Sequence, residues 1–163
     1  EKLRDMVLDP NGEGLSDRAE ALMIAAARAQ HVEEVVRPAI EQGKNVVSDR
    51  FIESSVAYQG HGRGLGPEEI FDISIFATQS LKADLIVLID VDAPLAANRR
   101  GKNLDRIEKA GDDFHSRVMS AYREMASEDP ERWIVVDGSG TVAEVSERVI
   151  DQVQVRLGKY EKD

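Results

Sequence analysis

The sequence predicts an α/β fold in which helices flank a parallel sheet. Residues 85–89 and 133–136 are short apolar runs, as expected of strands covered on both faces, and an aspartate directly follows each run. Residues 46–48 are a third, largely β-branched run, which ends in the same way at Asp49. The segments between these runs have helical spacing of apolar residues, which is typical of parallel strands joined by helices.

The N-terminal part predicts two helices. Residues 1–8 have an amphipathic pattern that a Pro-Asn-Gly turn brings to an end. Ser16 or Asp17 can cap a second, longer helix, which Pro38 is expected to kink and Gly43 to end. The apolar face of this longer helix would consist of Leu22, Ala25, Ala26, Ala29, Val32 and Val36.

Four further helices are predicted in the rest of the chain. Pro67 occupies a favourable first position for one of them, and Pro94 begins another. The buried face of the first would consist of Ile70, Ile73, Phe76 and Ala77. Helical spacing predicts a third helix over residues 113–126. Thr141 and Glu144 have the spacing of a capping box and predict the start of the last helix.

Composition restricts the fold and the classes of partner. The 163 residues include 42% hydrophobic side chains, which is enough for a single domain with one core. The net charge of -10 argues against a nucleic-acid backbone or an anionic membrane as the main partner, because both are negatively charged. The absence of cysteine excludes disulfides and thiolate metal sites. The apolar runs are too short to cross a bilayer and no signal peptide is visible, so a cytoplasmic protein is expected.

The stretch that begins at Asp49 carries residues suited to phosphate chemistry. The carboxylate of Asp49 can hold Mg²⁺ or accept a proton, and the guanidinium of Arg50 can bind a phosphate through two parallel hydrogen bonds. If the next segment is helical, Ser54, Ser55, Tyr58 and Gln59 gather close together and suit a nucleobase edge and a sugar. The residues alone also allow a plainer interpretation, in which Asp49 and Arg50 form an ion pair and the hydroxyls cap a helix.

Motifs in and around this stretch form an ordered set. The central signature consists of Asp49-Arg50-Phe51, Ser54-Ser55, Ala57-Tyr58-Gln59-Gly60 and Gly62-Arg63-Gly64. The other matching stretches are Glu1-Lys2-Leu3-Arg4, the helix with Glu20 and Arg28-Ala29-Gln30, Leu104-Asp105-Arg106-Ile107-Glu108, and Tyr122. Together these motifs closely resemble the bacterial thymidylate kinases (dTMP kinases), and the resemblance covers nearly the whole chain.

The resemblance implies a three-layer P-loop NTPase-like fold with a parallel sheet flanked by helices. Residues 1–163 would form a single nucleoside-monophosphate-kinase-like domain, with a lid at about residues 98–112. The implied reaction is transfer of the γ-phosphoryl group of ATP to dTMP, which gives dTDP for dTTP biosynthesis, with Mg²⁺ as cofactor. The implied partners are dTMP and ATP, without nucleic acid or membrane, and the full-length protein is expected to be a homodimer.

The resemblance also implies roles for individual residues. Catalytic roles fall to Asp49, Arg50, Arg99 and Arg100, with Asp49 positioning the metal or the acceptor and either Arg99 or Arg100 acting as the lid arginine. The residues that bind dTMP would be Ile24, Arg28, Arg50, Ser54, Ser55, Tyr58 and Gln59. The ATP phosphates would meet Arg99, Arg100 and Arg106, and the adenine would lie beside the loop of Asp137, Gly138 and Ser139.

Two departures from the family pattern stand out. Ile24 occupies the position of a phenylalanine that stacks on thymine in the family, and an aliphatic side chain lacks the aromatic face that favours stacking. The 163 residues contain no P-loop motif, since none of the seven lysines is followed by serine or threonine. The expectation is that an N-terminal part with two strands is missing before Glu1. Residues 1–163 alone are then expected to be inactive and to form no stable monomer.

Two other functions fit the same residues. Another P-loop nucleotide kinase or a deoxynucleoside kinase also carries an acid and an arginine after a strand, and a panel of acceptors would separate these enzymes. A remnant that binds a nucleotide without transferring phosphate is the other alternative, because the P-loop is missing from the sequence.

Overall fold

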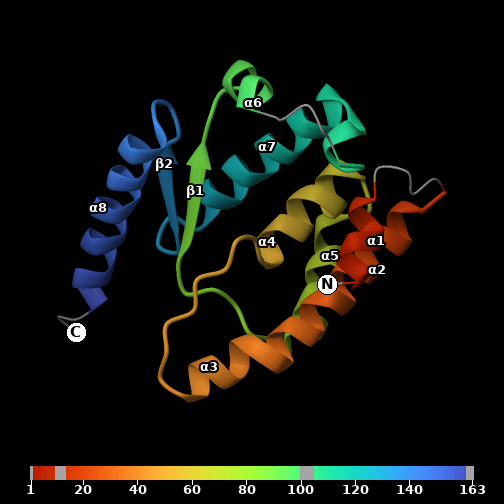
Figure 1. Ribbon diagram of the computed structural model, residues 1–163, viewed down its shortest axis with the longest axis horizontal. Helices are drawn as coiled ribbons and strands as arrows, with labels where there is room; N and C mark the ends of the chain where they lie inside the picture. Colours follow the sequence, from red (N-terminus) through yellow and green to blue (C-terminus); the bar gives the residue numbers. More distant parts are fainter. Residues whose placement is uncertain (1, 10–13, 100–104, 161–163) are drawn as a thin grey trace. The chain divides into compact units, whose positions relative to one another are not determined.

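The computed structural model describes residues 2–9, 14–99 and 105–160 (Figure 1). The described residues form two compact units, one within residues 1–83 and 103–121 and the other within residues 84–102 and 122–163. The first unit is helical, and the second holds a small parallel sheet with helices. The α/β class predicted from the sequence is therefore confirmed, whereas the single domain and the lid at about 98–112 stay predictions.

The first unit begins with α1 (Lys2–Leu8) and the long α2 (Asp17–His31). Ser16 caps α2 as predicted, because its hydroxyl accepts a hydrogen bond from the Ala19 N–H at 3.3 Å. The chain continues through a π-helical turn, η1 (Val32–Val36), into α3 (Arg37–Glu41), so it stays helical through Pro38. Gly43 ends this helical region with a left-handed φ of 72°, which glycine adopts without strain.

The apolar face of α2 differs in part from the predicted one. Ala25, Val32 and Val36 are buried, as predicted, but Leu22 is 56% exposed and Ala26 is exposed as well. The reason is that Glu20 has no exposed surface and forms part of the buried face. A glutamate counts as polar in an analysis of helical periodicity. The predicted apolar stripe of α2 therefore left out Glu20 and lay on a partly different side of the helix.

The segment after α3 does not form the predicted strand. In the described chain, residues 44–48 have no regular secondary structure, and the side chain of Val47 is 97% exposed. A strand is stable only when a neighbouring strand satisfies its backbone groups, and no described residue forms a ladder with this segment. The prediction of a strand at 46–48 is therefore wrong for the structure, although the run has strand-forming composition.

The signature stretch is helical, as expected, and packs into the first unit. It forms α4 (Ile52–Ser55) and then the π-helical η2 (Val56–Gly62), and Ile52, Val56 and Ala57 are buried. Helix α5 (Pro67–Thr78) follows with Pro67 at its start, as predicted. Of its predicted core residues, Ile70 and Ala77 are buried, whereas Phe76 is 85% exposed. Ser74 and Thr78 take part in the buried stripe instead, at i+4 and i+8 from Ile70, and Phe76 falls on the opposite side.

The second unit is built on two parallel strands, β1 (Ile86–Asp90) and β2 (Trp133–Asp137). Ile86 lies opposite Trp133, and Asp90 lies opposite Asp137, so both aspartates are at the same end of the sheet. The core of this sheet consists of Leu88, Ala126 and Trp133, against which Ile86, Tyr122 and Met125 pack.

Between and after these two strands in the sequence, the chain forms further helical elements. They are α6 (Ala93–Arg99), the 3₁₀ turn η3 (Glu108–Ala110), α7 (Asp112–Glu128) and α8 (Val142–Tyr160). The predicted capping box of α8 is confirmed, because the Glu144 N–H donates to the Thr141 hydroxyl and the Glu144 carboxylate accepts from the Thr141 N–H. Within the described chain, no helix is both long and apolar enough to cross a membrane.

Candidate functional site

Most of the predicted substrate residues lie in the first unit, and Arg50 has the most unusual backbone among them. Its φ of 68° is left-handed, which a non-glycine residue adopts at a cost of about 1–2 kcal/mol. The Ser48 hydroxyl donates to the Arg50 carbonyl at 2.9 Å, and the guanidinium lies 4.8 Å from the centre of the Tyr58 ring. Asp49 is exposed beside it. Strained residues of this kind are concentrated at functional sites.

A second contact joins α2 to the helix of the signature motif. The Arg28 guanidinium donates to the Ser55 hydroxyl at 2.9 Å, and it lies 5.8 Å from the centre of the Phe51 ring. Ile24 is one turn before Arg28 on α2 and is partly buried. The structure therefore brings Arg28 and Ser55 together, and their predicted common task at the base stays a prediction.

Glu20 connects three segments of the first unit. Its carboxylate accepts hydrogen bonds from the Gln59 amide at 2.8 Å and from the Arg63 guanidinium at 2.9 and 3.2 Å, and it also pairs with Arg106. Arg106 donates in addition to the Val7 carbonyl at 2.9 Å. These contacts hold α2, η2 and the segment before η3 around one buried charge.

The environment of Glu20 favours its ionised form. Burial alone would raise the pKa of the carboxyl, but hydrogen bonds from Arg63 and Gln59 and the positive charges of Arg63 and Arg106 together lower the pKa below its ordinary value. A carboxylate that stays ionised inside the protein can only accept hydrogen bonds. Glu20 therefore fixes the donors around it.

The sequence identifies Glu20 only as part of a matching helix, and the family resemblance predicts Arg106 at the ATP phosphates. A signal for the buried role was present, since Glu20 and Ala21 lie on the same stripe as Ala25 and Val32. A glutamate within an apolar stripe predicts a buried charge that needs cationic partners. The role of Arg106 toward ATP stays a prediction, and the structure shows it bound to Glu20 and the Val7 carbonyl.

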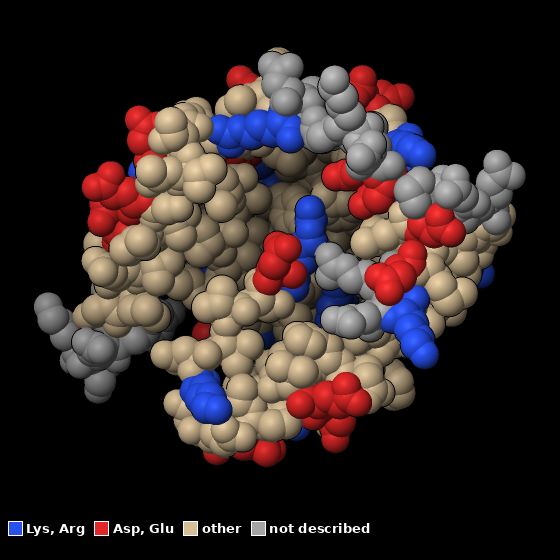
Figure 2. Space-filling view, viewed as in Figure 1, with Lys and Arg blue, Asp and Glu red and all other residues tan. Residues whose placement is uncertain are grey.

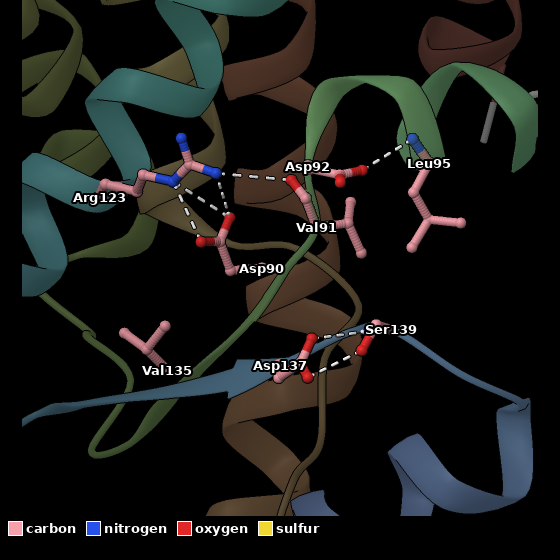
Figure 3. Close-up of a pocket in the computed structure, with 8 residues that line it drawn as sticks. All are labelled: Asp90, Val91, Asp92, Leu95, Arg123, Val135, Asp137 and Ser139. Atoms are coloured by element: carbon pink, nitrogen blue, oxygen red, sulfur yellow. Dashed lines mark hydrogen bonds and ion pairs between the residues drawn. The ribbon is translucent and has the colours of Figure 1, made fainter.

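The second unit has a pocket of about 410 Å³ at the carboxyl ends of its strands (Figure 3). The pocket is lined by Asp90, Val91, Asp92, Leu95, Arg123, Val135, Asp137 and Ser139. Arg123 binds both carboxylate oxygens of Asp90 at 2.9 to 3.2 Å, and this contact raises the pKa of Arg123.

Asp137, at the end of the other strand, accepts hydrogen bonds from the backbone N–H and the hydroxyl of Ser139, and these lower the pKa of Asp137. Both strand-end carboxylates thus have partners within the unit.

The predicted adenine-side loop is held by two arginines. Arg99 donates to the carbonyls of Gly138 and Gly140, both at 2.7 Å. Arg148 donates to the carbonyls of Asp137 and Ser139, the latter at 2.9 Å. The predicted catalytic role of Arg99 stays a prediction, and in the structure its guanidinium orders the loop of Asp137, Gly138 and Ser139. Arg100 lies outside the described residues.

Charged side chains are mixed over the surface that Figure 2 shows, with acidic groups scattered over the face and single basic side chains between them. The predicted metal site involves a single exposed carboxylate, Asp49. Among the residues that the structure describes, no three His, Cys, Asp or Glu side chains are grouped to hold a metal ion. Mg²⁺ commonly uses one or two protein carboxylates together with substrate phosphates and waters, so one carboxylate is compatible with it.

Comparison with known proteins gives a consistent result. The family model described as Thymidylate kinase matches residues 1–149. A thymidylate kinase of Pelobacter propionicus is 42% identical over 161 residues, which cover 94% of this chain and 74% of the relative. A thymidylate kinase of Cutibacterium acnes is 42% identical over 98% of this chain and 78% of its own length. A third, from Lactobacillus helveticus, is 40% identical over 96% of this chain and 76% of its own length.

Proposed function

The chain belongs to the thymidylate kinase family, whose members phosphorylate dTMP to dTDP with ATP, and from this premise we propose that its first unit carries the dTMP site. The function of the chain is accordingly ATP-dependent phosphorylation of dTMP. The observation that carries the assignment of the site is the hydrogen bond between Arg28 and Ser55, since it joins two predicted base-binding residues that are 27 positions apart in the sequence.

The phosphate of dTMP is assigned to Arg50. Its guanidinium is exposed at the start of the signature helix and lies over the Tyr58 ring, which restricts its orientation. A guanidinium presents two parallel N–H groups that match the geometry of a phosphate. Tyr58 would then lie beside the sugar, at the place where a ribose would carry its 2′-hydroxyl.

The thymine is assigned to Arg28, Ser55 and Gln59, with Ile24 as the side chain that covers the ring and Ser54 as a nearby hydroxyl. Arg28 and Ser55 are already in contact, so each limits the positions that the other can take. Ile24 would contribute dispersion and burial of apolar area but no aromatic stacking.

The chemistry needs positioning and charge neutralisation rather than a covalent nucleophile. Asp49 would hold Mg²⁺, which supplies positive charge to the phosphates when bound. Either Arg99 or Arg100 would neutralise charge on the transferred group, with Arg106 as a supporting cation. The loop of Asp137, Gly138 and Ser139 would lie against the adenine, and the hydrogen bonds from Arg99 and within the loop hold its backbone in one arrangement.

The proposal is tested by Arg50→Ala. Loss of a charge-assisted phosphate contact is expected to lower kcat/KM for dTMP by on the order of a hundredfold or more. Lys44→Ala is the matched control, because Lys44 is an exposed cation of the same segment that hydrogen-bonds only to Gln42 through its side chain in the described chain. Activity of Arg50→Ala equal to that of the parent protein would overturn the assignment of the phosphate site.

The proposal also includes the oligomeric state and the cellular location of the protein. A homodimer is proposed because Leu22 and Ala26 form an exposed apolar strip, one helical turn apart on α2. A cytoplasmic location is proposed because the substrates are soluble nucleotides.

A further inference from the structure

Glu20 is a buried charge to which the proposed chemistry gives no task. It has no exposed surface, and its carboxylate contacts the amide of Gln59 directly, at 2.8 Å. Arg63 and Arg106 balance its charge from two other segments, so the carboxylate is ionised and held in place. Gln59 itself is only 2% exposed, in the π-helical η2. Turns of this type often occur at functional sites.

The carboxylate determines which way the Gln59 amide points. An ionised carboxylate accepts hydrogen bonds and cannot donate one, so only the NH₂ group of Gln59 can face Glu20. The carbonyl oxygen of Gln59 then points away from Glu20 and is held there as a hydrogen-bond acceptor. Without Glu20, the amide could rotate by half a turn and present a donor instead.

We propose that Glu20 is a positioning residue that sets base specificity: it fixes the Gln59 amide so that its carbonyl oxygen accepts the N3–H of thymine. Thymine carries a donor at N3, whereas cytosine carries an acceptor there. A fixed acceptor on the protein therefore favours dTMP over dCMP, because cytosine would place two acceptors against each other. This inference rests on the proposed function, which assigns Gln59 to the base.

The test is a double-mutant cycle between Glu20→Asp and Gln59→Leu, read by calorimetric Kd values for dTMP and dCMP. Glu20→Asp keeps the charge beside Arg63 and Arg106 but withdraws the carboxylate from Gln59 by one methylene. It is expected to weaken dTMP binding about three- to tenfold and to lower the preference for dTMP over dCMP by a similar factor. In the Gln59→Leu background, the same substitution is expected to change neither value by more than about twofold.

Asp17→Asn is the matched control for this cycle. Asp17 lies 3.4 Å from Arg63, and its side chain is 49% exposed. The substitution therefore removes a charge from the same ion-pair network without altering the hydrogen bond between Glu20 and Gln59. Its preference for dTMP over dCMP is expected to equal that of the parent protein. A loss of preference equal to that of Glu20→Asp would overturn the inference, since a general change in the charge network would then suffice.

The outcomes separate the inference from the proposed function. If Gln59→Leu changes neither affinity nor preference, the assignment of Gln59 to the base fails, and the inference fails with it. If Gln59→Leu weakens dTMP binding but Glu20→Asp has no effect, or has the same effect in both backgrounds, only the inference fails. An effect of Glu20→Asp that depends on Gln59 supports both.

If Glu20→Asp unfolds the protein, an NMR measurement on the protein without substitutions tests the inference instead. The side-chain amide protons of Gln59, assigned by NMR through Gln59→Leu, are expected to exchange with solvent at least about tenfold more slowly than those of the exposed Gln30. Addition of dTMP should shift the Gln59 amide resonances, and addition of dCMP at the same concentration should not. Fast exchange, or equal shifts with both nucleotides, would overturn the inference.

Discussion

A carboxylate without exposed surface makes stability depend on pH, and Glu20 is such a group. The pKa of Glu20 is lower in the folded protein than its ordinary value of 4.5, so the unfolded chain binds the proton more readily. The stability that this group contributes is therefore complete above about pH 4.5 and is lost as the pH falls through the lower folded pKa. The free energy of unfolding should fall on acidification below that value.

The measurement is urea denaturation at several pH values, with Glu20→Gln as the comparison. The variant is expected to be less stable at neutral pH, because two arginines lose their buried counter-charge. Its stability should then fall less steeply than that of the parent protein as the solution is acidified. Parallel curves for the two proteins would show that Glu20 does not titrate differently in the folded and unfolded states.

Ile24 gives a second prediction for a single residue. If it covers the thymine ring, Ile24→Phe adds an aromatic face, and such contacts contribute about 0.5–1.5 kcal/mol beyond buried area. The Kd for dTMP is therefore expected to fall about two- to tenfold by calorimetry. Met23→Phe, at the neighbouring position of α2, serves as the control and should leave the Kd unchanged. A Kd for Ile24→Phe that is unchanged or higher would place Ile24 away from the base.

Single residues of the candidate site can be proposed from the sequence because their motif fixes both their type and their spacing. Arg28 and Ser55 are an example, since they are distant in the sequence and in contact in the structure. The central position of Glu20 could not be derived from the same pattern. Its partners, Gln59, Arg63 and Arg106, come from two other segments, and only the packing of these segments brings them to one carboxylate.

At the scale of elements, helices were predictable where a local signal marks their ends. Ser16, Gly43 and Pro67 each act where the sequence places them, since caps and turns depend on a few neighbouring residues. The strand predicted at 46–48 fails because a strand depends on a partner that the segment's own residues do not provide. The strand at β1 succeeds because β2 pairs with it over five residues.

The junction between η2 and α5 gives a prediction for an element. Gly60 is buried, and a Cβ atom at this position would lie 2.9 Å from the backbone Cα of Pro67, which cannot move without moving the start of α5. Gly60→Ala is therefore expected to destabilise the protein by about 1–3 kcal/mol. The measurement is the unfolding free energy in urea.

Gly158→Ala is the matched control for Gly60→Ala. Gly158 is an exposed residue of α8 with no atom near its added Cβ, so alanine should stabilise the helix by about 0.5–1 kcal/mol. Opposite signs for the two substitutions are expected. Equal effects would mean that helix propensity, and not the close approach to Pro67, decides the outcome at Gly60.

At the scale of the whole molecule, the exposed part of α2 is a feature that the packing of the first unit leaves unexplained. Leu22 and Ala26 continue the apolar pattern of this helix, yet in the structure they are exposed, and Leu22 has 56% of its surface accessible. Sequence periodicity placed them in the core of the chain. The same pattern is expected when a helix packs on one side against its own unit and on the other against a second copy.

The proposed homodimer leads to the last prediction. If α2 lies in the interface, Leu22→Glu buries an unpaired charge there and removes apolar area, so it should shift the protein from dimer to monomer at micromolar concentration. Sedimentation velocity measures this shift. Leu157→Glu, which introduces the same charge at a 50% exposed leucine of α8, is the control and should leave the dimer intact. A dimer that withstands Leu22→Glu but dissociates with Leu157→Glu would move the interface from α2 to α8, because an unpaired charge is tolerated on an exposed surface but not in a buried interface.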